Sequence, residues 1–318
     1  MKIRLFKKSK NTVRTDKKLS YEPPPYDRDR FSKDQIIQLL EAKVEFLLDE
    51  VSGLKTLVRY LTADKAEELP PFTQTKESFD FQWQNLPEGH AMLSNEDWKQ
   101  GVTETICRFT DLPADWFSGK EVMDAGCGQG RWTYGFGELQ VSACTSFDIS
   151  EFGLKRTREI AKEFGPSFVV LKQDILEDFD SLGTFDLVWC FGVIHHTGNT
   201  YQSFQNLIRC VKPGGYLFVM IYGEPRRSDL GDYQYYHDIF DMRCRTKNLP
   251  FNDKVKHIED RYGRELLHGY FDAISPEIND TYRWEEIVGW FLDAGFEDIK
   301  RTLPDHPNHH VIAKKKVY

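Results

Sequence analysis

Short apolar stretches alternate with amphipathic ones from Glu121 onward, and this alternation constrains the fold more than any other feature of the chain. Apolar stretches with the length of strands lie at residues 121–125, 143–149, 167–173, 185–191 and 215–222. Stretches with helical spacing lie at residues 129–139, 151–164 and 200–211. Strands that are separated by helices pair in parallel, and the connecting helices cover the sheet. We therefore expect an α/β domain with helices on both faces of a sheet.

Residues 224–282 interrupt the alternation with a polar, aromatic insertion. A further helix is expected at 283–294, because Gly295 gives it a good C-terminal stop. Two short strands then follow at 296–303 and 309–316, joined by a turn that contains proline and asparagine. Strands with so short a connection pair antiparallel. The sequence thus predicts a C-terminal antiparallel hairpin.

The first 30 residues differ in composition from the rest of the chain. Residues 1–18 carry eight basic residues and one acid, a charge of +7, whereas the formal net charge of the whole chain is −8. Three consecutive prolines, Pro23–Pro25, follow. Segments of this composition do not bury enough apolar surface to fold. We expect residues 1–30 to be a disordered basic tail on an acidic body, and the acidic balance argues against nucleic acid as the main partner.

Residues 31–63 are expected to form a coiled-coil helix. Between Ile37 and Leu61, apolar residues recur at alternating intervals of three and four, which is a heptad pattern. We favour self-association into a homo-oligomer through residues 32–62. The alternative is an amphipathic helix that packs on its own domain, since three further leucines widen the apolar stripe.

Residues 64–116 should connect this helix to the α/β domain, as a linker and an N-terminal lid or helical extension. Residues 63–80 are expected to be a polar linker around two prolines. An aromatic stretch, Phe79–Gln84, follows ahead of the α/β domain. Residues 95–111 have helical spacing and are expected to cover an edge of the sheet.

A glycine-rich turn follows the first expected strand. The chain passes there through Asp124, Ala125, Gly126, Cys127, Gly128, Gln129 and Gly130. Glycine is needed where the backbone turns sharply and approaches a ligand closely. The spacing G-x-G-x-G differs from the G-x-G-x-x-G that cradles a dinucleotide pyrophosphate. The leading acid, Asp124, also suits a ligand with a cationic portion better than a polyphosphate.

Acidic residues end the next two expected strands. Asp148 lies 22 residues after Gly126, where an acid accepts hydrogen bonds from a ribose diol. Asp174 ends the third strand, where its side chain could meet an adenine amino group. The alternative is that each aspartate caps the helix that follows it. Together with the glycine turn, the two acids favour a nucleoside ligand.

The motifs D-A-G-C-G-x-G, F-D-I-S, Q-D-I, F-D-L-V-x-x-x-G-V-I-H-H and V-K-P-G-G follow one another within residues 117–318. This series resembles the class I S-adenosylmethionine-dependent methyltransferases. The resemblance implies a Rossmann-like seven-stranded sheet, a methyltransferase domain at 117–318 with its insertion at 224–282, and S-adenosylmethionine as cofactor. The cofactor-binding residues that it implies are Asp124, Ala125, Gly126, Cys127, Gly128, Asp148, Ile149, Asp174, Ile175 and Phe191.

In that arrangement the two glycines Gly126 and Gly128 let the methionine portion approach. Asp148 holds the ribose, Asp174 with Ile175 meets the adenine, and the fourth strand ends at the reactive side of the cofactor. The methyl group is carried by a sulfonium, so the hard chemistry belongs to the cofactor. The protein has to align the acceptor with the methyl group and often has to remove a proton from it.

His195 and His196 follow the fourth expected strand, at the mouth of the expected site. Histidine titrates near neutrality, so either is a candidate to deprotonate or orient an acceptor hydroxyl. The alternative is that both are structural. No metal is expected, because His306, His309 and His310 lie in the hairpin turn without supporting carboxylates or cysteines.

Two segments could select the acceptor, namely the insertion with Tyr222 just ahead of it and the stretch Phe81–Gln84, which could act as a lid. The F-Q-W-Q stretch and Ser275-Pro276-Glu277 resemble, more loosely, bacterial methyltransferases that act on glycans or small metabolites. We therefore expect O-methylation of a sugar, glycan or small metabolite. The alternatives are an RNA or protein acceptor, or an inactive methyltransferase fold that assembles partners through its coiled coil.

Cysteine usage and hydropathy give the expected location. None of the six cysteines forms a C-x-x-C pair, which is typical of reduced, buried thiols. The chain has no apolar run that approaches the ~20 residues needed to span a bilayer. The sequence predicts a cytoplasmic protein.

Overall fold

The computed structural model describes residues 70–86, 93–177, 179, 181–224 and 230–317. These residues belong to one compact unit that begins at Pro70. Three predictions lie outside the described residues: the basic tail at 1–30, the coiled coil at 31–63 and self-association through 32–62.

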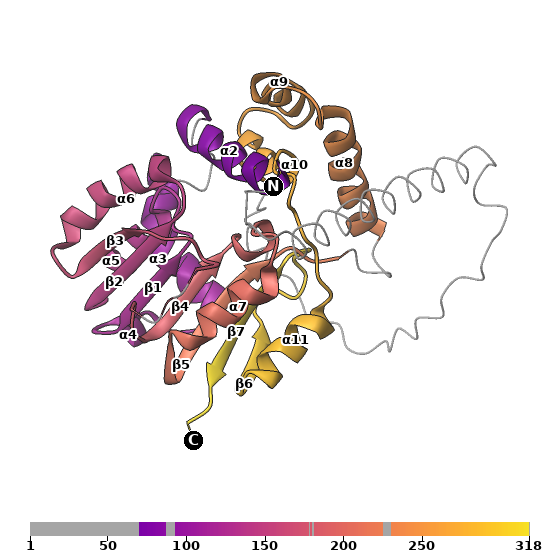
Figure 1. Cartoon of the computed structure of the whole chain (residues 1–318). Coiled ribbons are helices and arrows are strands. Elements are labelled where there is room, and N and C mark those ends of the chain that lie inside the picture. The colour runs from indigo at the N-terminus through magenta and orange to yellow at the C-terminus, as the bar shows by residue number, and fades with distance from the viewer. Residues whose placement is uncertain (1–69, 87–92, 178, 180, 225–229, 318) are drawn as a thin grey trace, which may run out of the picture. The chain divides into compact units, whose positions relative to one another are not determined.

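A seven-stranded sheet forms the centre of this unit (Figure 1). Its strands are β1 (Glu121–Ala125), β2 (Ala143–Asp148), β3 (Phe168–Lys172), β4 (Phe185–Phe191), β5 (Val211–Ile221), β6 (Phe296–Arg301) and β7 (His309–Lys315). Their order across the sheet is β3-β2-β1-β4-β5-β7-β6. The first five strands are parallel, and β7 runs antiparallel to both β5 and β6. The predicted α/β fold with a C-terminal antiparallel hairpin is confirmed.

Helices cover both faces of the sheet because both faces carry apolar side chains. Val188 and Cys190 of β4 belong to one core cluster, and Leu187 and Trp189 belong to the other, since successive side chains of a strand point to opposite faces. The first core is closed by α7 (Thr200–Arg209) and α11 (Trp284–Asp293). The second is closed by α3 (Glu96–Thr110), α4 (Ala114–Phe117), α5 (Arg131–Glu138) and α6 (Glu151–Phe164). Across the described ranges, no helix is both long enough and apolar enough to cross a membrane.

Strand β5 begins earlier than the sequence pattern indicates. The helix expected at 200–211 ends at Arg209, and the strand expected from residue 215 begins at Val211, which pairs with Phe185 ahead of a register shift. The proline and the two glycines that follow cannot continue a helix, and a strand tolerates them beside an irregularity of this kind.

The described part of the insertion forms three helices, whose small core is shared with Phe81 and Leu86 of the segment 70–86. They are α8 (Leu230–Thr246), α9 (Phe251–Tyr262) and α10 (Leu267–Ile274), grouped together in Figure 1. Their core includes Ile239 and Met242 of α8, Ile258 of α9 and Phe271 of α10. The sequence analysis predicts a polar, aromatic insertion here but does not predict these helices.

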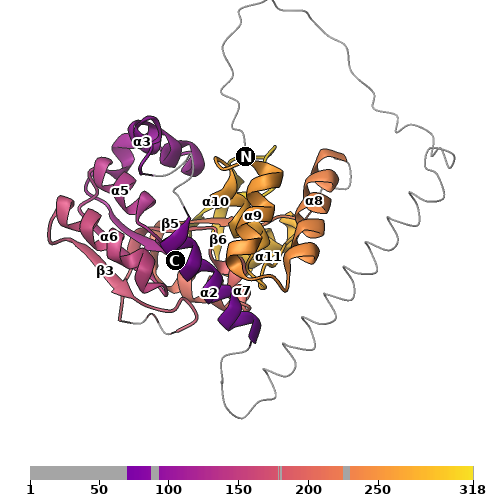
Figure 2. The same cartoon turned by 90° about the horizontal axis from the view of Figure 1, so that it is seen from above.

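Residues Pro70–Asn85 form a helix, α2, where the sequence analysis expected a polar linker at 63–80. Proline is tolerated in the first helical turn because its missing N–H would have no partner there. The helix is tied to α10, beside which it lies in Figures 1 and 2. The Gln82 side chain donates to the His268 carbonyl at 3.0 Å. Just past α10, the Ser275 hydroxyl accepts from Ser78 at 2.8 Å.

Candidate functional site

The turn between β1 and α5 has a backbone geometry that glycine adopts readily. The φ angles are +74° at Gly126, +51° at Gly128 and +84° at Gly130. In this region a side chain with a Cβ is strained. The N–H groups of Gly126 and Cys127 both donate to the Phe147 carbonyl, at 2.8 and 2.9 Å. The turn is therefore fixed to the end of β2.

Elements on two sides enclose this glycine turn. A Cβ on Gly128 would lie 2.7 Å from the ring of Trp83 in α2, and the Gln129 side chain donates to the Trp83 carbonyl at 2.8 Å. From α6, the Thr157 hydroxyl donates to the Gly128 carbonyl at 2.8 Å. The buried thiol of Cys127 faces the same hydroxyl at 3.8 Å. Helix α2, which was expected only as a linker and lid segment, thus contacts the turn directly.

Asp124 is the second-last residue of β1 and is 1% exposed. Its Oδ2 accepts a hydrogen bond from the Thr133 hydroxyl at 2.7 Å, whereas its Oδ1 has no partner among the described residues. Burial raises the pKa of Asp124 to about 7, although the Thr133 hydrogen bond and the charge of Arg131 act against it. A buried carboxylate oxygen without a partner is costly, so it is a natural binding point for a cationic or hydrogen-bonding ligand. The neighbouring Ala125 is buried in the sheet.

Asp148 ends β2 and shapes the glycine turn. Its Oδ2 accepts from the Gly128 N–H at 2.9 Å and its Oδ1 accepts from the Ser150 N–H at 2.8 Å. Burial raises the pKa of Asp148 against these hydrogen bonds. The N-cap of α6 is Ser150, so the alternative that Asp148 merely caps this helix is wrong. Ile149 is half-buried between them.

Asp174 and Ile175 lie together in the turn after β3. Oδ1 of Asp174 accepts from the Leu176 N–H at 2.9 Å. The Ile175 side chain is buried in the core that also contains Phe147 and Phe179. The isoleucine thus anchors the turn, and the aspartate sets its shape.

Phe191 ends β4 beside a cation that sequence reasoning missed. The guanidinium carbon of Arg131, the first residue of α5, lies 5.2 Å from the Phe191 ring centre and 4.9 Å from that of Trp132. The charge of Arg131 lowers the pKa values of Asp124 and Asp272. Its position directly after the glycine motif was the signal that could have found it.

His195 and His196 form the short 3-10 helix η1 (Ile194–His196) after β4, and both are buried. Nδ1 of His196 is hydrogen-bonded to the Ile278 carbonyl at 2.9 Å. Its Nε2, and both ring nitrogens of His195, have no hydrogen-bond partner in the part of the chain that the structure describes. Burial lowers the pKa of His196 to about 4 and that of His195 well below its ordinary value. Both rings are therefore neutral at neutral pH.

Tyr222, just after β5, lies beside these histidines. Its ring centre is 4.0 Å from that of His195, and its hydroxyl donates to Oδ2 of Asp272 in α10 at 3.1 Å. Burial raises the pKa of Asp272 to about 6. Sequence reasoning noted Tyr222 but missed Asp272, which lies in the insertion and belongs to no motif.

His306 in the hairpin turn and His309 and His310 at the start of β7 have local partners. His309 Nε2 is hydrogen-bonded to the Tyr282 carbonyl at 2.9 Å, and the rings of His306 and His310 lie 4.7 Å apart. Among the residues that the structure describes, no group of three or more histidines, cysteines or acids could hold a metal ion.

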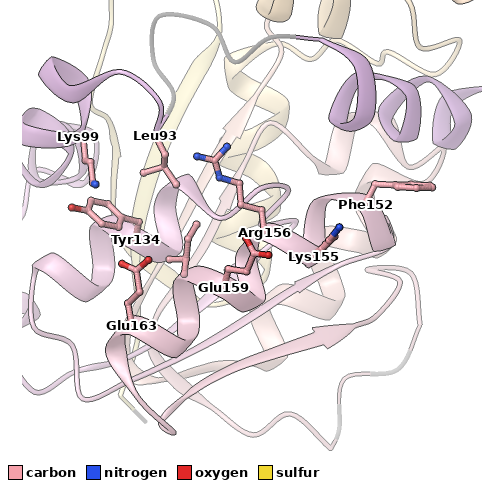
Figure 3. A pocket seen from close by; sticks show the side chains of 9 residues that line it. Leu93, Lys99, Tyr134, Phe152, Lys155, Arg156, Glu159 and Glu163 are labelled. Atoms are coloured by element: carbon pink, nitrogen blue, oxygen red, sulfur yellow. The ribbon is translucent and has the colours of Figure 1, made fainter.

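A solvent-facing hollow of about 520 Å³ lies between α3, α5 and α6 (Figure 3). Its lining mixes basic and acidic side chains around the ring of Tyr134, among them Lys99, Arg156 and Glu163. None of the strand-end residues described above lines it. The hollow is thus separate from the site at the carboxyl ends of the strands.

Comparison with known proteins finds a methyltransferase domain in part of this arrangement. Residues 117–260 match the model of a methyltransferase domain. An uncharacterised protein from Synechococcus is 33% identical over 213 residues, which are 58% of this chain and 50% of that protein. The ubiquinone biosynthesis O-methyltransferase of Vibrio parahaemolyticus is 30% identical over 107 residues, 33% of this chain and 45% of that enzyme. The chain thus spans about half the length of these curated relatives.

Among solved structures, an O-methyltransferase family protein from Burkholderia thailandensis superimposes with a TM-score of 0.50 at 13% identity, covering 90% of this chain and 74% of that one. A likeness at this identity concerns the fold alone. It agrees with the strand order and the reversed C-terminal hairpin described above. Residues 117–260 thus match a methyltransferase domain, and the strand order of the sheet agrees with the class I, Rossmann-like fold that the motifs predict.

Proposed function

We propose that this chain transfers a methyl group from S-adenosylmethionine to a hydroxyl of a sugar, glycan or small metabolite. The observation that carries the proposal is the buried carboxylate of Asp124, which has an oxygen without a partner among the described residues, directly before a glycine turn. A cofactor with ammonium and sulfonium charges would supply the missing partner. The glycines leave no Cβ in the way of its approach.

The other residues fit the parts of this cofactor. Asp148 would meet the ribose diol, Asp174 with Ile175 the adenine, and Phe191 the reactive side. The half-buried Ile149 would lie against the nucleoside. When bound, the cofactor supplies an electrophilic methyl group on sulfur, while the chain binds, orients and excludes water.

The residues that we expect to face the acceptor suit a neutral, hydroxylated substrate. His195 and His196 are buried, and burial lowers the pKa of each, so they would orient an acceptor by hydrogen bonds and not by charge. The ring of Tyr222 adds an aromatic surface that suits a sugar or another ring. The O-methyltransferase named among the relatives, which acts in ubiquinone biosynthesis, is consistent with a hydroxyl acceptor.

The test is a transfer assay without a chosen acceptor. Purified protein is incubated with S-adenosylmethionine labelled in its methyl group and with fractions of cell extract that contain metabolites, glycans, RNA or protein. We expect base-stable label in the metabolite or glycan fraction. Label confined to RNA or protein would replace the proposed acceptor class. Cofactor binding by calorimetry without label in any fraction would favour an inactive assembly protein.

We further propose that α2 acts as a lid on the glycine turn. Trp83→Ala would remove the ring that covers Gly128, so we expect binding of S-adenosylmethionine to weaken about tenfold, equivalent to about 1.4 kcal/mol. Calorimetry measures this directly. Gln84→Ala is the matched control, since Gln84 is an exposed neighbour on the same helix. Equal affinities for the Trp83 variant and the control would reject a lid.

The heptad pattern leads us to propose a homo-oligomer assembled through residues 32–62. The cysteine usage leads us to propose that the enzyme is cytoplasmic. Light scattering on the full chain should give a multiple of its 37.2 kDa mass. Deleting residues 1–63 should reduce the mass to that of a monomer. A full chain that already scatters as a monomer at micromolar concentration would contradict the coiled coil.

A further inference from the structure

Tyr222 and Asp272, both half-buried, form a hydrogen-bonded pair that the cofactor assignments leave without a role. The tyrosine follows β5 at the carboxyl edge of the sheet, and the aspartate belongs to α10 of the insertion. Their hydrogen bond, from hydroxyl to Oδ2, measures 3.1 Å. The pair therefore joins the catalytic edge of the sheet to the segment expected to select the acceptor.

Ring nitrogens without partners lie beside the tyrosine of this pair. The His195 ring centre lies 4.0 Å from that of Tyr222, and its side chain is 0% exposed with neither ring nitrogen hydrogen-bonded within the described ranges. The His196 ring centre lies 5.4 Å from Tyr222, and its Nε2 is likewise without a partner there. Buried polar atoms in folded proteins nearly always have partners. Three such nitrogens beside a tyrosine that is hydrogen-bonded to an acid thus point to a ligand that completes them.

Arg131 connects the pair to the glycine turn. It is the first residue of α5, and its charge acts on Asp272, on Asp124 and on Tyr222. Its guanidinium also lies 5.2 Å from the Phe191 ring centre. The charge of Arg131 thus acts on both Asp272 and Asp124, one of the proposed cofactor residues.

We infer that Asp272, held by Tyr222, is the group that accepts the proton of the acceptor hydroxyl, an inference that rests on the proposed function. The acceptor O–H bond breaks and its proton passes to an oxygen of Asp272. The oxygen's electron pair forms the new bond to the methyl carbon, and the pair of the broken carbon–sulfur bond stays on sulfur. The products are the methyl ether, the neutral thioether and a protonated Asp272, which releases its proton to solvent.

The proton affinities favour the carboxylate over the histidines. Burial raises the pKa of Asp272 to about 6, while the Tyr222 hydrogen bond and the Arg131 charge lower it. A base with a pKa near neutrality is ionised at pH 7 and still accepts a proton readily. Burial lowers the pKa of His196 to about 4, which makes it a weak base that keeps an orienting role. The titratable and charged groups that face Asp272 are Tyr222, Arg131 and Tyr235 of α8.

Asp272→Asn is the decisive variant because it keeps the size of the side chain and an acceptor for the Tyr222 hydroxyl. With the labelled extract fraction as substrate, we expect transfer to fall on the order of 10²- to 10⁴-fold, the usual contribution of a general base. The affinity for S-adenosylmethionine, measured by calorimetry, should stay unchanged. Asp260→Asn, at an exposed acid of α9, is the matched control and should transfer at the wild-type rate.

A carboxyl titration gives a readout that needs no acceptor. In protein labelled with ¹³C in its aspartate carboxyls, the signal that Asp272→Asn removes belongs to Asp272. We expect its midpoint near pH 6, against 3.8 for an ordinary aspartate. Tyr222→Phe should raise this midpoint, because the lost hydrogen bond stabilises the ionised form. The pH at which transfer reaches half its maximum should rise with it.

The outcomes separate this inference from the proposed function. If Asp272→Asn transfers at the wild-type rate, or if the carboxyl titrates near 3.8, Asp272 is not the proton acceptor although the chain remains a methyltransferase. If the wild-type protein neither binds S-adenosylmethionine nor labels any fraction, the proposed function is wrong, and so is the assignment of Asp272 as proton acceptor. If Asp272→Asn does not fold, the pH profile of Tyr222→Phe decides, because a profile identical to that of the wild type would rule out Asp272 as the proton acceptor.

Discussion

Alanine at Gly126 is expected to abolish binding of S-adenosylmethionine. The glycine has a φ of +74°, and a Cβ added there would lie 2.3 Å from a methyl carbon of Val193. The strained backbone alone costs on the order of 1–3 kcal/mol. The valine cannot move freely, because the next residues form η1 with the two buried histidines. The turn has to shift, and the cofactor loses the surface it approaches.

Calorimetry measures the loss of cofactor binding, and thermal unfolding measures the loss of stability. We expect no measurable heat of cofactor binding by Gly126→Ala, together with a lower melting temperature. Gly101→Ala is the matched control, since Gly101 lies inside α3 with nothing within 4 Å of an added Cβ. That variant should bind normally and gain about 0.5–1 kcal/mol of stability, as alanine does in a helix. Normal binding by Gly126→Ala would refute the proposed place of the cofactor.

Asp124→Asn is expected to stabilise the unliganded protein at neutral pH and to weaken its binding of the cofactor. Burial raises the pKa of Asp124 from 3.8 to about 7. Between these values the folded state keeps a proton that the unfolded state releases, so rising pH favours unfolding. The stability that this group contributes is fully present below about pH 4 and is lost as pH rises towards 7. Each pKa unit is equivalent to about 1.4 kcal/mol.

Unfolding stability and cofactor affinity should change in opposite directions as pH rises. For the wild type we expect unfolding stability to fall from pH 5 to 7 and cofactor affinity to rise, because the ionised carboxylate attracts the cationic ligand. In Asp124→Asn both slopes should flatten, and affinity at pH 8 should drop by about 1.5–3 kcal/mol, the value of a hydrogen bond to a charged group. An affinity that stays independent of pH in the wild type would show that Asp124 does not contact the cofactor. Asp260→Asn, which changes an exposed acid, should keep both slopes.

The parts of the fold that could be predicted from sequence are those with a local cause. Apolar stretches with strand and helical spacing predicted the parallel sheet and the C-terminal hairpin, because backbone hydrogen bonding and burial leave few other arrangements for them. The glycine turn was equally readable, since its positive φ angles exclude most residue types. The start of β5 at Val211 was missed because pairing with Phe185 outweighs the helical pattern before it.

The residues of the candidate site also fall into two groups, those that the local sequence places and those that only packing places. Sequence by itself determined the strand-end positions of Asp124 and Asp148, because the carboxyl ends of parallel strands meet at one edge. Only the tertiary structure decided that Trp83 covers the glycine turn and that Tyr222 meets Asp272, 50 positions further along the chain. The tertiary structure also decided that burial lowers the pKa values of His195 and His196. Contacts and burial of this kind depend on packing between distant segments, which leaves no periodic trace in the residues themselves.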